Sequence, residues 1–432
     1  MPSDSFRFIH AADLHIDSPL RGLEAYEGAP VERLRRATRD AFENLIKLAI
    51  EEDVAFVVIA GDLFDGKWQN METGLWTARQ FRQLAQRGIP VFLLRGNHDA
   101  ESKVRQAVSW PSNVFEFSTR QPQTFLSEKV GLPDSVRVAL HGQGFARAEV
   151  KDDLAATYPD AVPERFNIGV LHTSLTGHPA HNPYAATSLD VLRGRGYDYW
   201  ALGHIHLRET HCEEPYVAFS GNTQGRHINE CDAKGCLLVT VNEAAIESVE
   251  FRPLDTARWH RKAITLGTDD GLPELYDRVR ESIETFRSVD TEDDDRLSVI
   301  RFEISGACTA HQALSQSVTL HEAVHEIRNI ANEWEDDVWI EKIQFQTSPP
   351  IDLEQLRQSS DLVGELLRNI ELLAQDHDAL TAIANELTPL REKSGASSEL
   401  LEAGVDLTDS DLLVRWLRQA ESFLLARIGD GA

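Results

Sequence analysis

The chain has 432 residues, of which 42% are hydrophobic and 26% are charged, and its formal net charge is −27. This length predicts two or three domains, and the composition excludes a largely disordered protein. No apolar run approaches the roughly 20 residues that span a bilayer, and the four cysteines suit neither a disulfide scaffold nor a zinc finger, so we expect a cytoplasmic protein that does not enter a membrane.

The first half of the chain alternates short apolar runs with helical segments, which is the pattern of a layered α/β domain. The run Val54–Ala60 is continuously apolar, as expected of a strand buried on both faces. Helices are predicted over Val31–Ile50 and over Glu72–Arg87. The predicted strands are Phe6–His10, Val54–Ala60, Val91–Leu94, Ile168–Leu171, Tyr197–Leu202, Tyr216–Phe219 and Cys236–Val241.

A small separate α/β unit is predicted after about Pro253. Its expected strands and helices are Ala263–Leu266, Leu272–Phe286, Leu297–Ile304, Leu320–Trp334 and Val338–Phe345. Ser348-Pro349-Pro350 ends this unit, because consecutive prolines favour an extended linker. We therefore expect domains at residues 1–257, 258–347 and 348–432.

The last domain is predicted to be helical and to carry two apolar stripes. The first is Leu362, Leu366, Ile370 and Leu373, and the second is Leu412, Trp416, Ala420, Phe423 and Leu424. The final helix should begin near Thr408, which could form a capping box with Asp411. The second stripe could dock a partner, although packing on its own domain is the commoner role of such a face.

Five short polar motifs follow predicted strands. They are Asp13-Leu14-His15, Gly61-Asp62, Gly96-Asn97-His98-Asp99, His172 and Gly203-His204-Ile205-His206. Alternate residues of an extended chain point the same way, so Asp13 with His15, and His204 with His206, can face one site. Glycines let the backbone turn sharply after a strand. Because open α/β sheets build their sites beyond the carboxyl ends of strands, we expect one shared site.

The residue types in these motifs indicate a metal centre. Two carboxylates, one amide and four imidazoles are about the number needed by two metals that share a bridging carboxylate. Imidazole and oxygen ligands without thiolate favour manganese, with iron and zinc as alternatives. Each motif alone is more often a turn or a buried polar group. All five in this order make coincidence a poor explanation.

The motifs resemble the pattern of the calcineurin-like metallophosphoesterases. Within that family, the sequence is similar to the SbcD and YhaO branch of DNA repair exonucleases, over residues 5–255. The branch resemblance rests on Phe8–His15, Gly61–Asp65, Ser220–His227 and Lys234-Gly235-Cys236. It implies a two-sheet sandwich flanked by helices, with a small α/β capping domain and a C-terminal helical region.

The resemblance also implies the roles of the motif residues. Asp13, His15, Asp62 and His206 would hold one metal, with Asp62 bridging, and Asn97, His172 and His204 would complete the second. His98 would assist the leaving group, and Asp99 would orient His98. A pair of metals about 3.5–4 Å apart can hold a hydroxide that attacks the phosphorus, and a histidine suits proton transfer near neutral pH.

Other polar residues near the motifs have alternative roles. Arg226 and His227 could contact a substrate phosphate, although a structural role is equally consistent with the sequence. Asp65 is expected to support the site or a turn rather than bind metal. His178 and His181 are expected to be loop residues without ligand roles, and the arginines at 33, 35, 36 and 39 to form a solvated helix surface rather than a phosphate-binding face.

The leading functional hypothesis is a manganese-dependent DNA exonuclease that acts in DNA repair. In such relatives the terminal helices dock an SMC-like or coiled-coil ATPase of the SbcC or YhaN type, and homodimers are common. The alternative is a small-molecule phosphodiesterase or phosphatase of the same fold, for example one acting on cyclic nucleotides, since function depends on the site rather than the fold. A non-enzymatic scaffold is the third hypothesis, but no predicted ligand is missing.

The net charge bears on this choice, because enzymes that bind nucleic acid usually present a basic face. The first 257 residues carry about −9 and the remainder about −18. Two divalent metals would offset about four of these charges locally. The acidity therefore argues against tight, unaided binding to duplex DNA.

Overall fold

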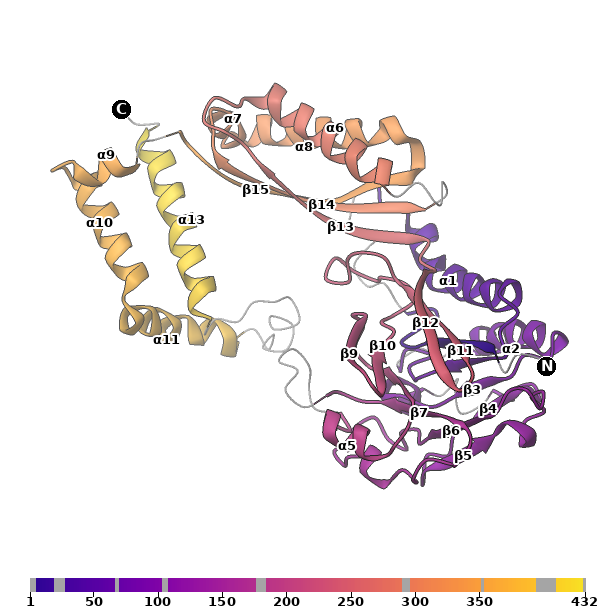
Figure 1. The fold of residues 1–432 in the computed structure, drawn as a ribbon. Coiled ribbons are helices and arrows are strands. Elements are labelled where there is room, and N and C mark those ends of the chain that lie inside the picture. The colour runs from indigo at the N-terminus through magenta and orange to yellow at the C-terminus, as the bar shows by residue number, and fades with distance from the viewer. Residues whose placement is uncertain are drawn as a thin grey trace. The chain divides into compact units, whose positions relative to one another are not determined.

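The computed structural model describes residues 5–18, 28–66, 70–102, 108–175, 184–289, 296–350, 353–393 and 409–429. The chain divides into two compact units (Figure 1). The first is Met1–His260 with Asp293–Val299, and the second is Arg261–Glu292 with Ile300–Ala432. Among the described helices, none is both long enough and apolar enough to cross a membrane.

The first unit contains two six-stranded sheets that face each other. One sheet has the order β12 (Ala245–Pro253), β11 (Gly235–Asn242), β1 (Phe6–Ala11), β2 (Phe56–Ile59), β3 (Val91–Leu93) and β4 (Val114–Glu116). The other has the order β5 (Gln123–Leu126), β6 (Val138–Gly142), β7 (Phe166–His172), β8 (Tyr199–Gly203), β10 (Tyr216–Phe219) and β9 (Glu209–Glu213). Strands β1 to β4 run parallel to one another, and so do β6, β7, β8 and β10.

The side chains of each strand point alternately to its two faces, so one core forms between the sheets and another forms between a sheet and the helices. On β1, Phe8 joins Val58 and Ile168 in the core between the two sheets. Its neighbour Ile9 packs with the buried face of α1 (Val31–Glu51) and with α2 (Met71–Gln86). Successive residues of a strand point to opposite faces, so a strand buried on both sides is apolar throughout.

The two sheets approach each other closely where their parallel strands end. Within the first sheet, the backbone N–H of Ala60, after β2, donates to the carbonyl of Ala11 at 2.9 Å, which holds the ends of β1 and β2 together. A side chain at Gly203, at the end of β8, would collide with the carbonyl oxygen of Ala60. The loops after β1 and β2 therefore lie against the loop after β8, and the motifs of both sheets meet at one edge.

The second unit has a three-stranded sheet in the order β13 (Ala257–Thr265), β14 (Leu297–Ala307) and β15 (Val338–Ser348). Helices α6 (Leu272–Val289) and α8 (Ser317–Ala331) share a core with this sheet, in which Val279, Phe302 and Ile327 are fully buried. The helices that follow are α9 (Leu353–Gln358), α10 (Leu362–Gln375), α11 (His377–Lys393) and α13 (Ser410–Gly429).

The predicted α/β sandwich is confirmed, and each predicted strand and helix up to β15 has a counterpart in the structure. The sequence did not reveal the short or partly exposed elements. These are β4, β5, β6, β9, β12, α3 (Asn97–Glu101), α5 (Leu189–Gly194), α7 (Ala310–Leu314) and the 3₁₀ turns η2 (Ser127–Lys129), η3 (Ala155–Thr157) and η4 (Asn332–Asp337).

The two apolar stripes predicted for the terminal helices coincide only in part with the faces that the structure buries. On α10 the buried positions are Gly364, Leu367 and Ile370, while Leu362 is 81% exposed. On α13 the side chain of Leu413 is buried and that of Trp416 is exposed. Neighbouring helices select which face is buried, and a stripe of leucines alone does not. Thr408 lies outside the described residues, and Asp409 accepts a hydrogen bond from the N–H of Asp411 at 2.9 Å near the start of α13.

Candidate metal centre

The loops after β1, β2 and β8 leave the extended conformation at four predicted ligands. The φ angles of Asp13, His15, Asp62 and His204 are 52°, 45°, 51° and 103°. Side-chain-bearing residues rarely adopt this left-handed conformation, and such strain is concentrated at functional sites. Asp13 and His15 do face one site, as expected, but not through strand alternation, because the backbone is left-handed at both residues.

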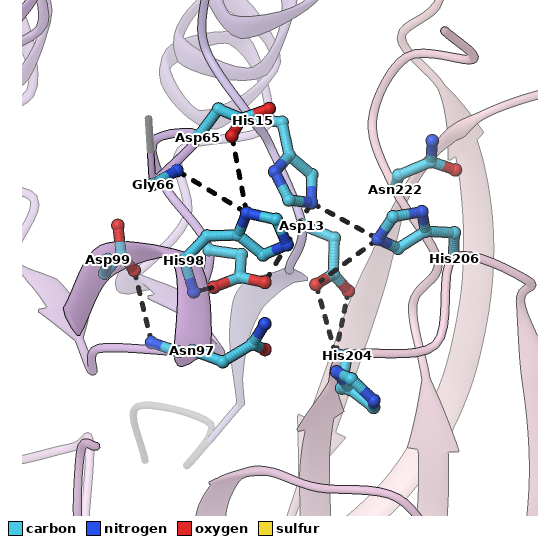
Figure 2. Close-up of polar contacts among 12 residues, drawn as sticks. Asp13, His15, Asp65, Gly66, Asn97, His98, Asp99, His204, His206 and Asn222 are labelled. Carbon is cyan, nitrogen blue, oxygen red and sulfur yellow. Dashed lines mark hydrogen bonds and ion pairs between the residues drawn. The ribbon is translucent and has the colours of Figure 1, made fainter. Parts of the chain in front are cut away.

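One group of candidate ligands joins the loop after β1 to the loop after β8. Ligand atoms of Asp13, His15 and His206 all lie within 4.8 Å of one another. Nε2 of His206 is 3.2 Å from Nε2 of His15 and 4.0 Å from Oδ1 of Asp13. The backbone N–H of His204 donates to both oxygens of the Asp13 carboxylate, at 3.1 and 3.0 Å (Figure 2). These bonds fix the carboxylate beside the two imidazoles.

A second group centres on Asp62 and His172, and it includes Asp13. Nε2 of His172 lies 3.3 Å from Oδ2 of Asp62 and 2.9 Å from Oδ1 of Asn97. Nδ1 of His172 lies 2.9 Å from the carbonyl oxygen of Ala60. A proton on Nδ1 satisfies that carbonyl and leaves the lone pair of Nε2 directed at the oxygen ligands.

The imidazole of His204 completes the constellation, because its ring centroid lies 5.2 Å from that of His172. The structure thus brings together every residue that the sequence proposed as a ligand. Asp62 also belongs to a third group, in which the ligand atoms of Asp62, His15 and His98 lie within 4.8 Å of one another. Asp13 and Asp62 each belong to two of the three groups, so the bridging role assigned to Asp62 stays a prediction.

Two glycines make room for this second group. At Gly61, where φ is 102°, a Cβ atom would collide with Nδ1 of His172. At Gly96 it would collide with Oδ1 of Asp62 and lie only 2.8 Å from Cε1 of His172. The glycines of the motifs are therefore required by the ligands that pack on them as well as by the turns.

The charges of the cluster fit divalent cations. Asp13 and Asp62 are each only 1% exposed, and buried carboxylates require compensating charge. Burial by itself lowers the pKa of His172, but the adjacent Asp62 raises it to about 9, so a proton balances the carboxylate when no metal is bound. Burial holds the pKa of His15 well below its usual value. Within the described part of the chain, Nδ1 of His15 is buried without a hydrogen-bond partner. Neutral imidazoles and carboxylates that exchange protons for metal are the expected donor set.

His98 is the second residue of helix α3, beside these ligands, and its side chain is 40% exposed. Its backbone N–H donates to Oδ1 of Asp62 at 2.9 Å, and its Nδ1 lies 3.4 Å from Oδ1 of Asp65. Burial lowers the pKa of His98, but the hydrogen bond with Asp65 and the charge of Asp62 raise it above its usual value. The same contact with His98 lowers the pKa of Asp65. The two carboxylates therefore favour the protonated ring, and burial opposes it.

Asp99, which follows His98 in the sequence, is bonded to backbone groups of two loops. Its carboxylate accepts hydrogen bonds from the backbone N–H groups of Leu63, Phe64 and Gly96, at 3.1, 3.1 and 3.2 Å. It thereby ties the loop after β2 to the loop after β3. The carboxylate that lies against the ring of His98 is that of Asp65, and the assignment of Asp99 as the residue that orients His98 stays a prediction.

Comparison with known proteins identifies the family. The model of the calcineurin-like phosphoesterases matches residues 6–208, and the model of the middle domain of metallophosphoesterase YhaO matches residues 259–348. The chain is 32% identical over 351 residues to the uncharacterized metallophosphoesterase YhaO of Bacillus subtilis, covering 81% of this chain and 84% of that protein. The chain belongs to the calcineurin-like metallophosphoesterases. It is a metal-dependent phosphoesterase, and its family implies a centre of two divalent metals.

More distant relatives of this metallophosphoesterase include DNA repair proteins. The DNA double-strand break repair protein Mre11 of Haloferax volcanii is 27% identical over 283 residues, which cover 64% of this chain and 58% of that protein. A dimetal phosphatase from Danio rerio of known structure is 12% identical, with a TM-score of 0.34, and is matched over 57% of this chain and 99% of its own.

Glu230 is a site residue of this metallophosphoesterase that the sequence did not single out. Oε1 of this buried carboxylate lies 2.7 Å from Nδ1 of His206. Burial alone raises the pKa of Glu230, but the hydrogen bond with His206 and the charge of Arg226 hold it well below its usual value. Glu230 is one of 70 acidic residues in the chain, and nothing in the sequence distinguishes it from the others. Only its position in the folded loop after β10 identifies it as part of the site.

Arg226 and His227 lie on the same loop, at different depths. The side chain of Arg226 is 14% exposed, and its Nη2 is 3.1 Å from Glu230. The side chain of His227 is 55% exposed, with Nε2 3.6 Å from Oε1 of Glu230. Of the helical arginines, Arg39 is bonded to both oxygens of Asp17, which supports a structural role on α1. His178 and His181 lie outside the described residues.

Proposed function

We propose that this metallophosphoesterase hydrolyses DNA phosphodiester bonds, chiefly as an exonuclease in DNA repair. The observation that carries the hydrolytic part of the proposal is the position of His98. Its half-exposed ring lies beside the buried ligand Asp62, against the supporting carboxylate of Asp65. A protonated imidazole at the rim of a metal centre is suited to protonate a leaving oxygen.

We assign the metal ligands in two sets. Asp13, His15, Asp62 and His206 would hold one ion, and Asp62, Asn97, His172 and His204 would hold the second. Manganese is the proposed metal, because the donors combine imidazole nitrogen with carboxylate and amide oxygen and include no thiolate. Two bound divalent cations supply an activated water and neutralise negative charge at phosphorus.

The side chains of the chain itself supply the remaining steps. His98 donates its proton to the departing 3′ oxygen, and Asp65 stabilises the protonated ring before the transfer. Arg226 and His227 are proposed to contact the phosphate, since both lie on the loop after β10, where Arg226 is 3.2 Å from His206 and His227 is 3.6 Å from Glu230. Asp99 keeps Leu63 and Gly96 in place, so that Asp62 and His98 approach the same phosphate.

DNA is the proposed substrate because the chain is related to Mre11 proteins that bear the name of DNA double-strand break repair. We further propose that residues 258–347 form a capping domain that shapes the substrate groove. The terminal helices would dock a coiled-coil ATPase of the SbcC or YhaN type in the cytoplasm, and a homodimer is also proposed. Such a partner would supply DNA affinity to a chain whose net charge is −27.

The proposal is tested by incubating the chain with Mn²⁺ and linear duplex DNA labelled at one end. A covalently closed circle of the same sequence separates exonuclease from endonuclease activity. Bis(p-nitrophenyl) phosphate reports simple phosphodiester hydrolysis in parallel, and His98→Ala and Asp62→Asn are the controls for contaminating nucleases. We expect the wild-type chain to degrade the linear DNA and the two variants to leave it intact. Cleavage of the small ester without cleavage of DNA, even with the candidate ATPase added, would contradict the nuclease proposal.

The alternative function is hydrolysis of a small phosphodiester or phosphomonoester, such as a cyclic nucleotide. The acidic charge of the chain favours it, because a small substrate needs no extended basic surface. A salt titration separates the two. DNA binding through several phosphates weakens steeply with salt, whereas hydrolysis of a small ester should change little.

A further inference from the structure

The carboxylate of Glu230 accepts hydrogen bonds from donors on the loop after β8 and on the loop after β10. Its Oε1 lies 2.7 Å from Nδ1 of His206 and 3.1 Å from Nη2 of Arg226. Its Oε2 accepts hydrogen bonds from the backbone N–H of Arg226 at 2.8 Å and from Nδ2 of Asn222 at 3.0 Å. Both oxygens are therefore occupied, and the carboxylate has a single orientation.

This arrangement determines which nitrogen of His206 faces the metal ligands. A carboxylate oxygen is only an acceptor, so Nδ1 of His206 must carry the proton that it shares with Glu230. The lone pair is then on Nε2, which lies 3.2 Å from Nε2 of His15 and 4.0 Å from Oδ1 of Asp13. The carbonyl of His206 is also held, because it accepts a hydrogen bond from Nζ of Lys234 at 3.1 Å.

The same carboxylate holds Arg226 close to the ring of His206. Nη2 of Arg226 lies 3.2 Å from Nδ1 of His206, although both groups carry donor hydrogens. They tolerate this distance because each is bonded to Oε1 of Glu230. Without that negative charge, the guanidinium and the imidazole N–H would repel each other and one of them would move.

We propose that Glu230 is a positioning residue that fixes Nε2 of His206 on the metal and Arg226 beside the substrate phosphate. The proposal rests on the metal centre and phosphate contact described under Proposed function. Partners that orient a metal-ligating histidine contribute about 10–100-fold to metal affinity. Glu230 therefore sets two properties at once, the affinity for metal and the affinity for the phosphate.

A matched control comes from a second buried glutamate that is bonded to an arginine. Oε1 and Oε2 of Glu341 accept hydrogen bonds from Arg301 at 2.6 and 2.8 Å, and Glu341 is 4% exposed compared with 6% for Glu230. Glu341 lies in the second unit, outside the candidate ligand groups. Substituting it removes the same chemical contact without touching the proposed centre.

The test measures Mn²⁺ binding by titration calorimetry and by the EPR signal of free Mn²⁺. Glu230→Gln should weaken binding at one of the two ions by about 10–100-fold, while Glu341→Gln binds both ions as the wild type does. Glu230→Asp keeps the charge and should restore part of the affinity. Arg226→Gln leaves the bond between Glu230 and His206 in place, so it should bind Mn²⁺ normally and raise only the KM for bis(p-nitrophenyl) phosphate.

Thermal unfolding in EDTA verifies that each variant is folded, and Glu230→Asp replaces Glu230→Gln if the latter is not. Wild-type Mn²⁺ affinity in a folded Glu230 variant would overturn the inference, as would an equal loss in Glu341→Gln. Neither readout depends on DNA, so a failure of the nuclease proposal leaves this test intact. A wild-type chain that binds no Mn²⁺ would overturn both the metal centre and the role of Glu230.

Discussion

Replacing Gly96 with alanine tests whether the residue after β3 must lack a side chain for the metal ligands to reach their positions. The added methyl group would collide with Oδ1 of Asp62 and lie 2.8 Å from Cε1 of His172. Gly96 has no left-handed backbone, in contrast to Gly61, so the alanine introduces crowding without conformational strain. Any effect therefore reports on the space that the two ligands occupy.

The size of the effect follows from the crowding. Carbon atoms pack at about 3.5–4.0 Å, so the ring of His172 must withdraw by several tenths of an ångström and the Asp62 carboxylate by more. Overpacking of a buried site costs about 1–3 kcal/mol. If this cost falls on the arrangement that binds metal, affinity falls by about 5- to 150-fold, because 1.4 kcal/mol corresponds to a factor of ten.

The assay is calorimetric titration of the metal-free chain with Mn²⁺, combined with thermal unfolding in EDTA. Gly194→Ala is the matched control, because a Cβ atom at Gly194 meets nothing within 4 Å. That variant should bind Mn²⁺ normally and be unchanged or more stable by about 0.4–1 kcal/mol. Wild-type Mn²⁺ affinity in Gly96→Ala would refute the steric argument, since the ligands would then accommodate the methyl group without loss.

Three further predictions concern His98, its carboxylate partner and the metals. His98→Ala should lower kcat for bis(p-nitrophenyl) phosphate by about 10²–10⁴-fold while two Mn²⁺ ions remain bound, and loss of one ion would show instead that His98 is a ligand. Asp65→Asn should lower kcat by a smaller factor, about tenfold, because His98 keeps its proton less readily without the carboxylate; an unchanged kcat would exclude that role. Mn²⁺ at a hundred times its Kd should stabilise the EDTA-treated chain in denaturant unfolding by about 2.7 kcal/mol for each ion bound. An unaltered midpoint would refute metal binding by the buried pair Asp13 and Asp62.

The sequence was informative about the ligands because their residue types and order are unusual, even where the geometric argument failed. The motif Asp13-Leu14-His15 predicted a shared site through strand alternation, but both residues are left-handed in the structure. The N–H of His15 bonds to the carbonyl of Asp62 at 3.0 Å, which ties the loop after β1 to the loop after β2. A pairing between segments so far apart along the chain cannot be deduced from local spacing.

The supporting residues were harder to find from the sequence for the same reason. Asp99 is adjacent to His98, which suggested that it orients the ring, yet Asp65 makes that contact from another loop. The N–H of Leu63 and of Gly96 instead converge on Asp99. Adjacent residues of a helix point in different directions, so proximity in sequence is a poor guide to which carboxylate supports a histidine.

The terminal helices illustrate a different limit. Helical periodicity correctly predicted that the described residues after Leu353 are mostly helical, but several registers of the stripe on α10 are compatible with its leucines. Helix α10 packs against α9, α11 and α13, and Leu367 and Ile370 are its buried aliphatic residues. The ion pair between Arg418 and Glu371, at 2.7 Å, joins α13 to α10, so part of the choice is made by a helix that lies about 50 residues away.

The distribution of the ligands along the chain has a consequence for biosynthesis. Asp13 and His204 are bonded although 191 residues separate them, and β1 lies between β2 and β11, a strand that ends at Asn242. A nascent chain emerging from the ribosome therefore has the first two carboxylates long before it has the imidazoles of the second sheet. Metal capture has to wait until more than half of the polypeptide has been translated, so it would mark the end of folding of the first unit rather than guide its beginning.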